Sequence, residues 1–371
     1  MIDFLKKLIQ ADSTLEHGEF QVSRVIQDYF HGFGVDSRIF CWDKTRANIT
    51  VRIPGHNHTP ALVFASHLDV VPAGQQQWKY PPFGATEEDG KIYGRGATDM
   101  KGPMAAAIEA ICQIVKDNVR LKGDIIFTAT AGEETDGSGA QKFVEEYKGK
   151  HNNFAGFILT EPTNFELITA HRGILWLNIS TKGKTAHGSM PHLGINAILS
   201  MNQFINELAG YKINIQPHPL LGTCSLSANT ISGGNAMNVV PDKCTLGIDI
   251  RTLPNQNHKD IIDDFQKIFA KLNSQNPDFQ ADVEIARHAG ALENDNNCQF
   301  IQTICQAINL DKTSTAGYTT DGPFFAKLGF PVVIYGPGNG QVCHKPDEYI
   351  EIADIQRGVD LYKNIILKFL T

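Results

Sequence analysis

The stretch Ala61-Leu-Val-Phe-Ala-Ser-His-Leu-Asp69 joins a nearly continuous apolar run to a histidine and an aspartate. An apolar run of this length is typical of a strand buried on both faces of a sheet. Two similar runs, Asp124–Thr130 and Ala155–Thr160, follow along the chain. Helical patterns separate the runs, and this alternation predicts an α/β fold: a mainly parallel sheet with helices on both faces.

The other elements of this first domain fit the same pattern. Helix 102–117 has Pro103 near its first turn, where proline is tolerated. We also predict helices at about 2–10, 19–32, 139–147, 297–308 and 354–370, and strands at 35–41, 47–53 and 331–335.

The pattern changes near residue 173. Ile174–Lys182 alternates apolar and polar residues, as expected of an antiparallel strand with one exposed face. A helix at about 194–209, strands at 223–231 and 243–251, a helix at 257–272 and a strand at 278–287 follow. This β-α-β-β-α-β order predicts two helices on a four-stranded antiparallel sheet. We therefore expect a discontinuous first domain, 1–172 and 289–371, with 173–288 inserted as a second domain.

Composition excludes several classes of protein. The 371 residues carry a formal net charge of −7, and we find no basic run longer than Lys6-Lys7, so a nucleic-acid partner is not expected. No segment approaches the roughly 20 apolar residues that span a bilayer, and the N-terminus lacks signal-peptide features. The 7 cysteines are scattered without a Cys-x-x-Cys motif. We expect a cytoplasmic protein with reduced thiols and no membrane partner.

Polar residues gather where the predicted core strands end, the edge at which open α/β sheets bind ligands. They are His67, Asp69, Asp99, Glu133, Glu134, Glu161 and His344. Two histidines with several carboxylates form a nitrogen and oxygen ligand set suited to zinc or a neighbouring divalent metal. Each residue alone has an ordinary explanation, and the Glu133-Glu134 pair alone would be read as a solvated loop. Their joint occurrence favours a metal site.

Six motifs in this order resemble those of a known family, and the resemblance covers essentially the whole chain. They are Ser66-His-Leu-Asp-Val-Val-Pro72, Gly94-Arg-Gly-Ala-Thr-Asp-Met-Lys-Gly102, Gly132-Glu-Glu134, Thr160-Glu-Pro162, Gly183-Lys-Thr-Ala-His-Gly-Ser189 and His344-Lys-Pro-Asp-Glu348. The family is that of the co-catalytic zinc deacylases and exopeptidases. It includes acetylornithine deacetylase, succinyl-diaminopimelate desuccinylase, aminoacylase and glutamate-type carboxypeptidase.

The resemblance implies a role for each residue at the strand ends. His67 and Glu161 would hold one metal, Glu134 and His344 the other, and Asp99 would bridge the two. Asp69 would accept the N–H of the His67 imidazole. Glu133 would be the general base that acts on a water between the metals. The two divalent ions are expected to be zinc, with cobalt or manganese as alternatives. The family often has an acidic residue where this chain has Gly132.

The resemblance extends to three residues of the inserted domain. His187 matches a histidine that stabilises the oxyanion and, in dimeric members, reaches the partner's active site, so the insert would act as a lid and dimerisation domain. Asn238 and Arg251 match positions that clamp a substrate carboxylate, for which arginine is suited by its planar fork. The alternatives are a polar loop residue for His187 and a surface arginine paired with a neighbouring acid for Arg251.

The resemblance thus implies a two-metal amidohydrolase acting on an N-acyl amino acid or a short peptide, and a homodimer. The substrate could be that of the deacetylase or of the desuccinylase. A metallo-carboxypeptidase or aminoacylase of the same family is the nearest alternative, and a metal-free binding protein that kept the fold is another. Cys343 beside His344 suggests a Cys–His nucleophile, but adjacent residues rarely present both side chains to one point, so we interpret Cys343 as packing.

Overall fold

A computed structural model describes residues 1–149 and 153–371. Contacts between Cα atoms divide the chain into two compact units. Unit 1 consists of Met1–Ala170, Glu293–Thr315 and Thr320–Thr371, and unit 2 of His171–Leu292 and Ala316–Thr319. The insert expected at 173–288 lies within unit 2, which also takes in the short segment Ala316–Thr319.

Unit 1 is built on a large sheet, in which the described residues contribute nine strands. Eight of them follow the order β1-β2-β6-β3-β7-β15-β8-β13, and β14 pairs with β8. Their bounds are Ser37–Cys41 (β1), Ala47–Ile53 (β2), Thr59–His67 (β3), Gly123–Thr130 (β6), Phe154–Leu159 (β7), Ile168–His171 (β8), Leu292–Glu293 (β13), Ser314–Ala316 (β14) and Val332–Ile334 (β15). The centre is parallel, since β3 pairs in parallel with β6 and β7, and β7 with β15. Towards the edges the pairs β1–β2, β2–β6 and β15–β8 are antiparallel.

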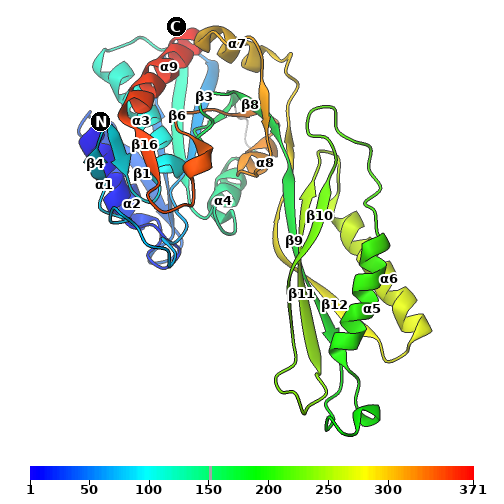
Figure 1. Ribbon diagram of the computed structural model, residues 1–371. Helices are drawn as coiled ribbons and strands as arrows, with labels where there is room; N and C mark the ends of the chain where they lie inside the picture. Colours follow the sequence, from blue (N-terminus) through cyan, green and yellow to red (C-terminus); the bar gives the residue numbers. More distant parts are fainter. Residues whose placement is uncertain (150–152) are drawn as a thin grey trace. The chain divides into compact units, whose positions relative to one another are not determined.

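Helices cover both faces of this sheet, as the alternation of elements predicts (Figure 1). The helices of unit 1 are Ile2–Gln10 (α1), Phe20–His31 (α2), Gly102–Lys116 (α3), Ser138–Tyr147 (α4), Gln299–Ile308 (α7), Gly322–Ala326 (α8) and Ile352–Leu370 (α9). Buried residues of α1, α2, α3, α7 and α9 form one core with Phe64 of β3 and Ile158 of β7. The side chain of the neighbouring Phe157 points to the opposite face of the sheet, where it packs against Phe143 of α4 and Phe325 of α8. A mainly parallel α/β architecture is therefore confirmed.

Unit 2 has the β-α-β-β-α-β order that the sequence predicts. Its elements are Gly173–Lys182 (β9), Ala197–Gly210 (α5), Ser225–Gly233 (β10), Lys243–Thr252 (β11), His258–Gln275 (α6) and Gln280–Ala289 (β12). The sheet order is β10-β11-β9-β12 and every pair is antiparallel. Leu175, Leu177 and Ile179 alternate inward and pack with Phe204 of α5 and Phe265 of α6. In Figure 1 both helices lie against one face of this sheet.

Short elements near the edge of unit 1 were not predicted. They are a three-stranded sheet of Thr86–Glu88 (β4), Lys91–Tyr93 (β5) and Tyr349–Glu351 (β16), and the π-helical turn Ala97–Lys101 (η1), besides β8, β13, β14 and α8. Strands of two to four residues carry too little periodicity to be read from sequence. The helix predicted from 194 begins only at Ala197, because Asn196 caps it by accepting the backbone N–H groups of Ile198 and Leu199.

Candidate metal centre

The carboxyl ends of the parallel strands of unit 1 bring together all five predicted metal ligands. His67 is the last residue of β3, Glu134 lies just beyond β6 and Glu161 just beyond β7. Asp99 lies in the turn η1, and His344 in the segment that leads to β16. Side chains from five separate chain segments thus converge at the edge where a sheet of this kind binds ligands.

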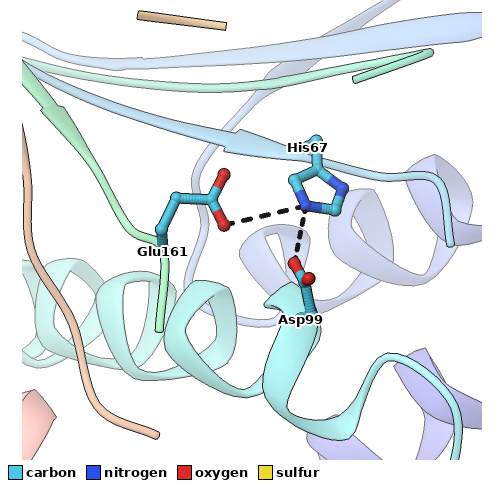
Figure 2. A group of neighbouring side chains, drawn as sticks. All are labelled: His67, Asp99 and Glu161. Carbon is cyan, nitrogen blue, oxygen red and sulfur yellow. Dashed lines mark hydrogen bonds and ion pairs between the residues drawn. The ribbon is translucent and has the colours of Figure 1, made fainter. Parts of the chain in front are cut away.

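One group of candidate ligands consists of His67, Asp99 and Glu161, and one ligand atom from each lies within 4.8 Å of the others. Figure 2 shows these three side chains facing one another. The Nε2 atom of His67 lies 3.1 Å from Oδ1 of Asp99 and 3.8 Å from Oε2 of Glu161. His67 is only 3% exposed, so its imidazole faces these carboxylates and not solvent.

A second group consists of Asp99, Glu134 and His344, with its ligand atoms also within 4.8 Å of one another. The Nε2 atom of His344 lies 2.8 Å from Oε1 of Glu134 and 3.2 Å from Oδ2 of Asp99. Asp99 therefore belongs to both groups and turns one oxygen to each histidine, the arrangement needed of a bridging carboxylate. A third set, His67, Glu133 and Glu134, meets the same distance limit, so distance alone does not separate the roles of the two glutamates.

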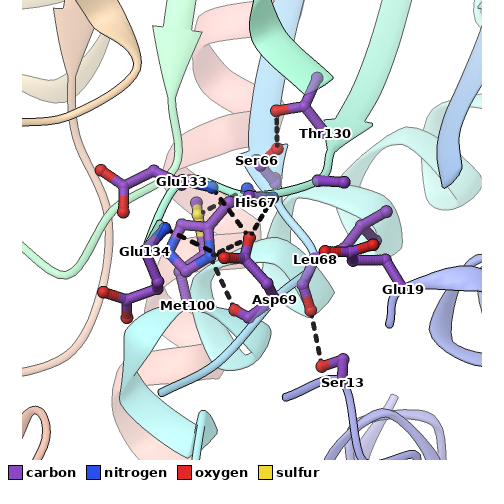
Figure 3. Close-up of polar contacts among 12 residues, drawn as sticks. Ser13, Glu19, Ser66, His67, Leu68, Asp69, Met100, Thr130, Glu133 and Glu134 are labelled. Atoms are coloured by element: carbon purple, nitrogen blue, oxygen red, sulfur yellow. Dashed lines mark hydrogen bonds and ion pairs between the residues drawn. The ribbon is translucent and has the colours of Figure 1, made fainter. Parts of the chain in front are cut away.

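Asp69 does something different from what the sequence suggests. The Nδ1 atom of His67 lies 2.9 Å from the backbone oxygen of Asp69, while the nearest oxygen of its carboxylate is 3.7 Å away. That carboxylate instead accepts the backbone N–H groups of Gly132, Glu133 and Glu134 at 2.9, 3.1 and 3.0 Å (Figure 3). The prediction that Asp69 accepts the N–H of the His67 imidazole is thus corrected for its carboxylate: the backbone carbonyl contacts the imidazole, and the carboxylate holds the turn that carries the glutamate pair.

Gly132 fits this turn for a steric reason. Its φ of +83° is a left-handed conformation that favours glycine. A Cβ atom here would lie 2.4 Å from Oδ1 of Asp136 and 2.4 Å from a guanidinium nitrogen of Arg46. The glycine that stands where the resemblance implies an acidic residue is therefore favoured by the local backbone of this chain.

The protein groups of the site shift one another's proton affinity strongly. Burial, only partly opposed by His67, raises the pKa of Glu161 to about 8. Burial also raises the pKa of Glu133 well above its usual value. Burial opposes ionisation of Asp99, but its hydrogen bonds with His344 and His67 outweigh burial and lower its pKa. Crowded carboxylates of this kind hold protons unless another positive charge is near, and a divalent cation would supply that charge.

Two further side chains lie against this cluster. Asp321, 5% exposed, is among the charges that raise the pKa of Glu133 and Glu161, yet it belongs to none of the three ligand groups. The sequence predicts no chemical role for Asp321, since Thr319-Thr-Asp-Gly322 carries no ligand pattern. Burial, followed by the charge of Asp99, raises the pKa of the Cys343 thiol, which disfavours the thiolate and agrees with interpreting Cys343 as a packing residue.

The three predicted residues of the insert lie in unit 2. His187 is exposed, and its Nδ1 lies 2.7 Å from Oγ of Ser189. Asn238 lies beside it, because its backbone oxygen accepts the N–H of Gly188 at 2.8 Å. Arg251 is paired with Asp249, its Nε lying 3.0 Å from the carboxylate. Pairing with a neighbouring acid is the alternative that the sequence left open for this arginine.

An open α/β sheet with two histidines and three carboxylates at its carboxyl edge defines a class, the metal-dependent hydrolases. The donor set fits zinc and its neighbours, which accept imidazole nitrogen and carboxylate oxygen. Comparison with known proteins makes the class specific. Residues 63–368 match the model of peptidase family M20/M25/M40, and the chain belongs to that family. It is accordingly a hydrolase of amide bonds, as the resemblance implied.

Relatives and solved structures agree with this assignment. The chain is 30% identical to a probable succinyl-diaminopimelate desuccinylase of Staphylococcus epidermidis, over 100% of this chain and 97% of the relative. It is 32% identical to an acetylornithine deacetylase of Buchnera aphidicola, over 83% and 80%. An M20 family metallo-carboxypeptidase from Sulfolobus solfataricus shares the fold with a TM-score of 0.81 at 18% identity, over 98% of both chains. A dinuclear metal binding M20 peptidase of Bacillus subtilis does so with a TM-score of 0.72 at 15% identity, over 99% and 96%.

Proposed function

We propose that this protein is a two-metal amidohydrolase that removes the acyl group from an N-acyl amino acid, as a desuccinylase or a deacetylase does. The observation that carries the proposal is the position of Asp99, whose two carboxylate oxygens face His67 and His344 at 3.1 and 3.2 Å. A carboxylate shared by two ligand groups is what two neighbouring cations of like charge require. The names of the relatives support the substrate class.

The residues fit two divalent ions, with zinc first and cobalt or manganese as alternatives. In this proposal His67 and Glu161 would hold one ion, Glu134 and His344 would hold the other, and Asp99 would be shared, as its place in two candidate ligand groups allows. Bound ions of this kind polarise a substrate carbonyl and lower the pKa of water. The nitrogen and oxygen atoms of the candidate ligands suit the binding of such ions.

The remaining residues would position groups and move protons. Glu133 would take the proton of the attacking water and later deliver it to the leaving amine, as general base and then general acid. Asp69 keeps Glu133 in place through the backbone of its turn. Asn238 and Arg251 would bind the free carboxylate of the substrate, and Arg251 would then exchange Asp249 for that carboxylate.

A substrate panel tests the function. Protein reconstituted with Zn²⁺ or Co²⁺ is expected to release amine from N-succinyl-diaminopimelate, N-acetylornithine or another N-acyl amino acid, and to lose this activity with a chelator. The measurement is chromatographic separation of the released amino acid from each of these compounds and from a set of short peptides, because the substrates themselves carry an amine that reacts with ninhydrin. Release of C-terminal residues from peptides alone would favour the carboxypeptidase alternative, which the fold match to a metallo-carboxypeptidase also supports. Hydrolysis of none would favour a binding protein.

The proposal includes a homodimer in the cytoplasm, formed through unit 2. In the described residues of unit 2, β10 is an edge strand of the sheet, and its side chains are mostly exposed. Large apolar side chains of unit 2 lie exposed, including Ile231 of β10 at 58%, Met237 at 107% and Leu199 of α5 at 62%. An exposed edge strand with apolar neighbours is suited to pairing with another chain. No described helix is long and apolar enough to cross a membrane.

His187 is expected to act on the substrate without binding metal. The contact of its Nδ1 with Ser189 leaves Nε2 on the opposite edge of the ring for the developing oxyanion. His187→Ala should lower kcat by about 10²–10³-fold, the usual effect of losing one oxyanion donor, with unchanged metal content by elemental analysis. The matched control is His192→Ala, an exposed histidine of the same segment, which should retain wild-type turnover. A wild-type rate for His187→Ala would remove this residue from the mechanism.

Hybrid dimers test whether His187 serves the partner's site. Co-expressed His187→Ala and Glu133→Gln chains would form hybrids in which one site combines an intact Glu133 with the partner subunit's His187. Random pairing should then restore about a quarter of wild-type activity, since half the dimers are hybrids with one working site each. No recovery, or a fully active monomer by light scattering, would contradict the cross-subunit role.

A further inference from the structure

Glu348 is a carboxylate without a role in the proposed chemistry, and it lies in the interior of unit 1. Its side chain is 0% exposed. One oxygen, Oε1, accepts the backbone N–H of Thr98 at 3.0 Å and that of Asp99 at 3.1 Å. The other oxygen, Oε2, accepts a hydrogen bond from the guanidinium of Arg95. A residue about 250 positions away in the sequence therefore holds the backbone of the proposed bridging ligand.

The turn η1 needs such an acceptor. Asp99 has non-helical φ and ψ of −115° and 95°, so the helical hydrogen-bond pattern is broken within the turn. Thr98 is 0% exposed, which keeps water away from its backbone. Buried backbone N–H groups are nearly always paired, and Glu348 pairs both of these. Without it, the turn would leave two donors unsatisfied or move.

Arg95 fixes Glu348 in turn. Its side chain is 2% exposed, one of its nitrogens lies 3.4 Å from the backbone oxygen of Pro72, and its guanidinium carbon lies 5.1 Å from the ring centre of Trp78. A buried ion pair contributes little net stability, because both charges lose their hydration. The pair has a structural reason instead, because Arg95 fixes the carboxylate of Glu348, and this carboxylate also accepts the backbone N–H groups of Thr98 and Asp99.

Asp69 shows the same arrangement at a second turn of the site, where its buried carboxylate accepts three backbone N–H groups of the turn with Glu133 and Glu134. We infer that Glu348, held by Arg95, is a positioning residue that fixes the backbone of Asp99 so that one carboxylate can serve both metal ions. This inference rests on the proposed two-metal function. It assigns Glu348 neither metal nor substrate contact.

Two measurements on the full chain test it. In the metal-free protein, Glu348→Ala should speed hydrogen exchange of the Thr98 and Asp99 amides about tenfold or more, because their acceptor is gone. With Co²⁺ as probe, titration should show that the weaker of two ions binds about 10–100-fold less tightly, as losses around a metal ligand commonly do. The magnetic coupling between two Co²⁺ ions, read by electron paramagnetic resonance, should fall in parallel. Arg95→Met should weaken Co²⁺ binding in the same direction.

Glu348→Gln covers the case in which the alanine variant fails to fold. It keeps the shape and one acceptor oxygen but sets an amide N–H against Arg95, so its Co²⁺ affinity should lie between those of wild type and Glu348→Ala. The matched control is Asp124→Asn, which removes another carboxylate that pairs with an arginine, Arg52, and accepts a backbone N–H, that of Gly55 at 2.8 Å, but does so at the amino end of β6, away from the metal centre. It should lower the melting temperature while keeping Co²⁺ affinity within about twofold of wild type.

The outcomes separate this inference from the proposed function. Wild-type protein that binds fewer than two Co²⁺ ions would contradict the function, and the amide exchange of Thr98 and Asp99 would still report on Glu348. Wild-type protein with two coupled ions, and a folded Glu348→Ala or Glu348→Gln that keeps both at wild-type affinity and coupling, would overturn the positioning role alone. Equal loss of metal in Asp124→Asn would overturn it too, since general destabilisation would then explain the effect.

Discussion

Replacing Glu133 with glutamine is expected to abolish turnover while both metal ions stay bound, whereas Glu134→Gln is expected to lose metal. Glutamine keeps the size of Glu133 but cannot accept the proton of the attacking water. A general base contributes about 10²–10⁴-fold, so kcat should fall by at least that range. Loss of a ligand from a site of few ligands instead lowers metal affinity directly.

The reason for the division lies in the turn itself. Asp69 accepts the N–H groups of both glutamates and so holds the backbone from which their side chains extend (Figure 3). Glu134 contacts His344 at 2.8 Å and shares a ligand group with Asp99. Glu133 belongs only to the third group, with His67 and Glu134, and to neither of the groups that contain Asp99. Its raised pKa, caused chiefly by burial, is typical of a carboxylate that takes up a proton.

The measurement is the metal content after dialysis, set beside kcat for the same preparations. Glu145→Gln, an exposed glutamate on α4, is the control for loss of one carboxylate and should behave as wild type. If Glu133→Gln and Glu134→Gln lose metal equally, Glu133 is a ligand and the general base must be sought elsewhere.

The sequence predicted the fold well where burial dictates the residue type. The runs at 61–66, 124–130 and 155–160 are apolar because both faces of these strands are covered, and all three are central strands of the sheet. The alternation at 174–182 likewise reflects one covered face, with Leu175 buried and Trp176 37% exposed. Short strands such as β8 and β16 owe their structure to their neighbours, so their own residues carry little signal.

The candidate site was predictable only in part, for a physical reason. Ligands such as His67 and Glu161 lie at the ends of buried strands or just beyond them, so their convergence can be inferred from strand ends alone. The roles of Asp69 and Glu348 are to accept backbone N–H groups that have no other acceptor within their turns. Which N–H groups these are depends on the φ and ψ values of the turns, and no local sequence pattern encodes those values. Asp321 likewise reaches the cluster from a distant segment of the chain.

Asp99→Asn is expected to lose at least one of the two ions, because it removes the negative charge that both would share. Two divalent cations in neighbouring ligand groups repel each other strongly even at an effective dielectric constant of about 20. Loss of the carboxylate shared by both ions should therefore weaken metal binding more than loss of any other ligand. Loss of one Lewis acid is worth several kcal/mol, which corresponds to a fall in kcat/KM of about a thousandfold.

The metal-dependent rise in melting temperature reports the same loss without an assay of activity. At a free metal concentration of about 100 times Kd, one site adds about 2.7 kcal/mol of stability, so wild-type protein should gain more from added Zn²⁺ than Asp99→Asn does. Asp321→Asn is the decisive control, since it removes a buried carboxylate that acts on Glu133 and Glu161 but belongs to no ligand group. It should keep both ions. If Asp321→Asn loses metal as Asp99→Asn does, the total negative charge of the site holds the ions, and not bridging by Asp99. If Asp99→Asn keeps both ions and shows the full rise in melting temperature, Asp99 is not a bridging ligand.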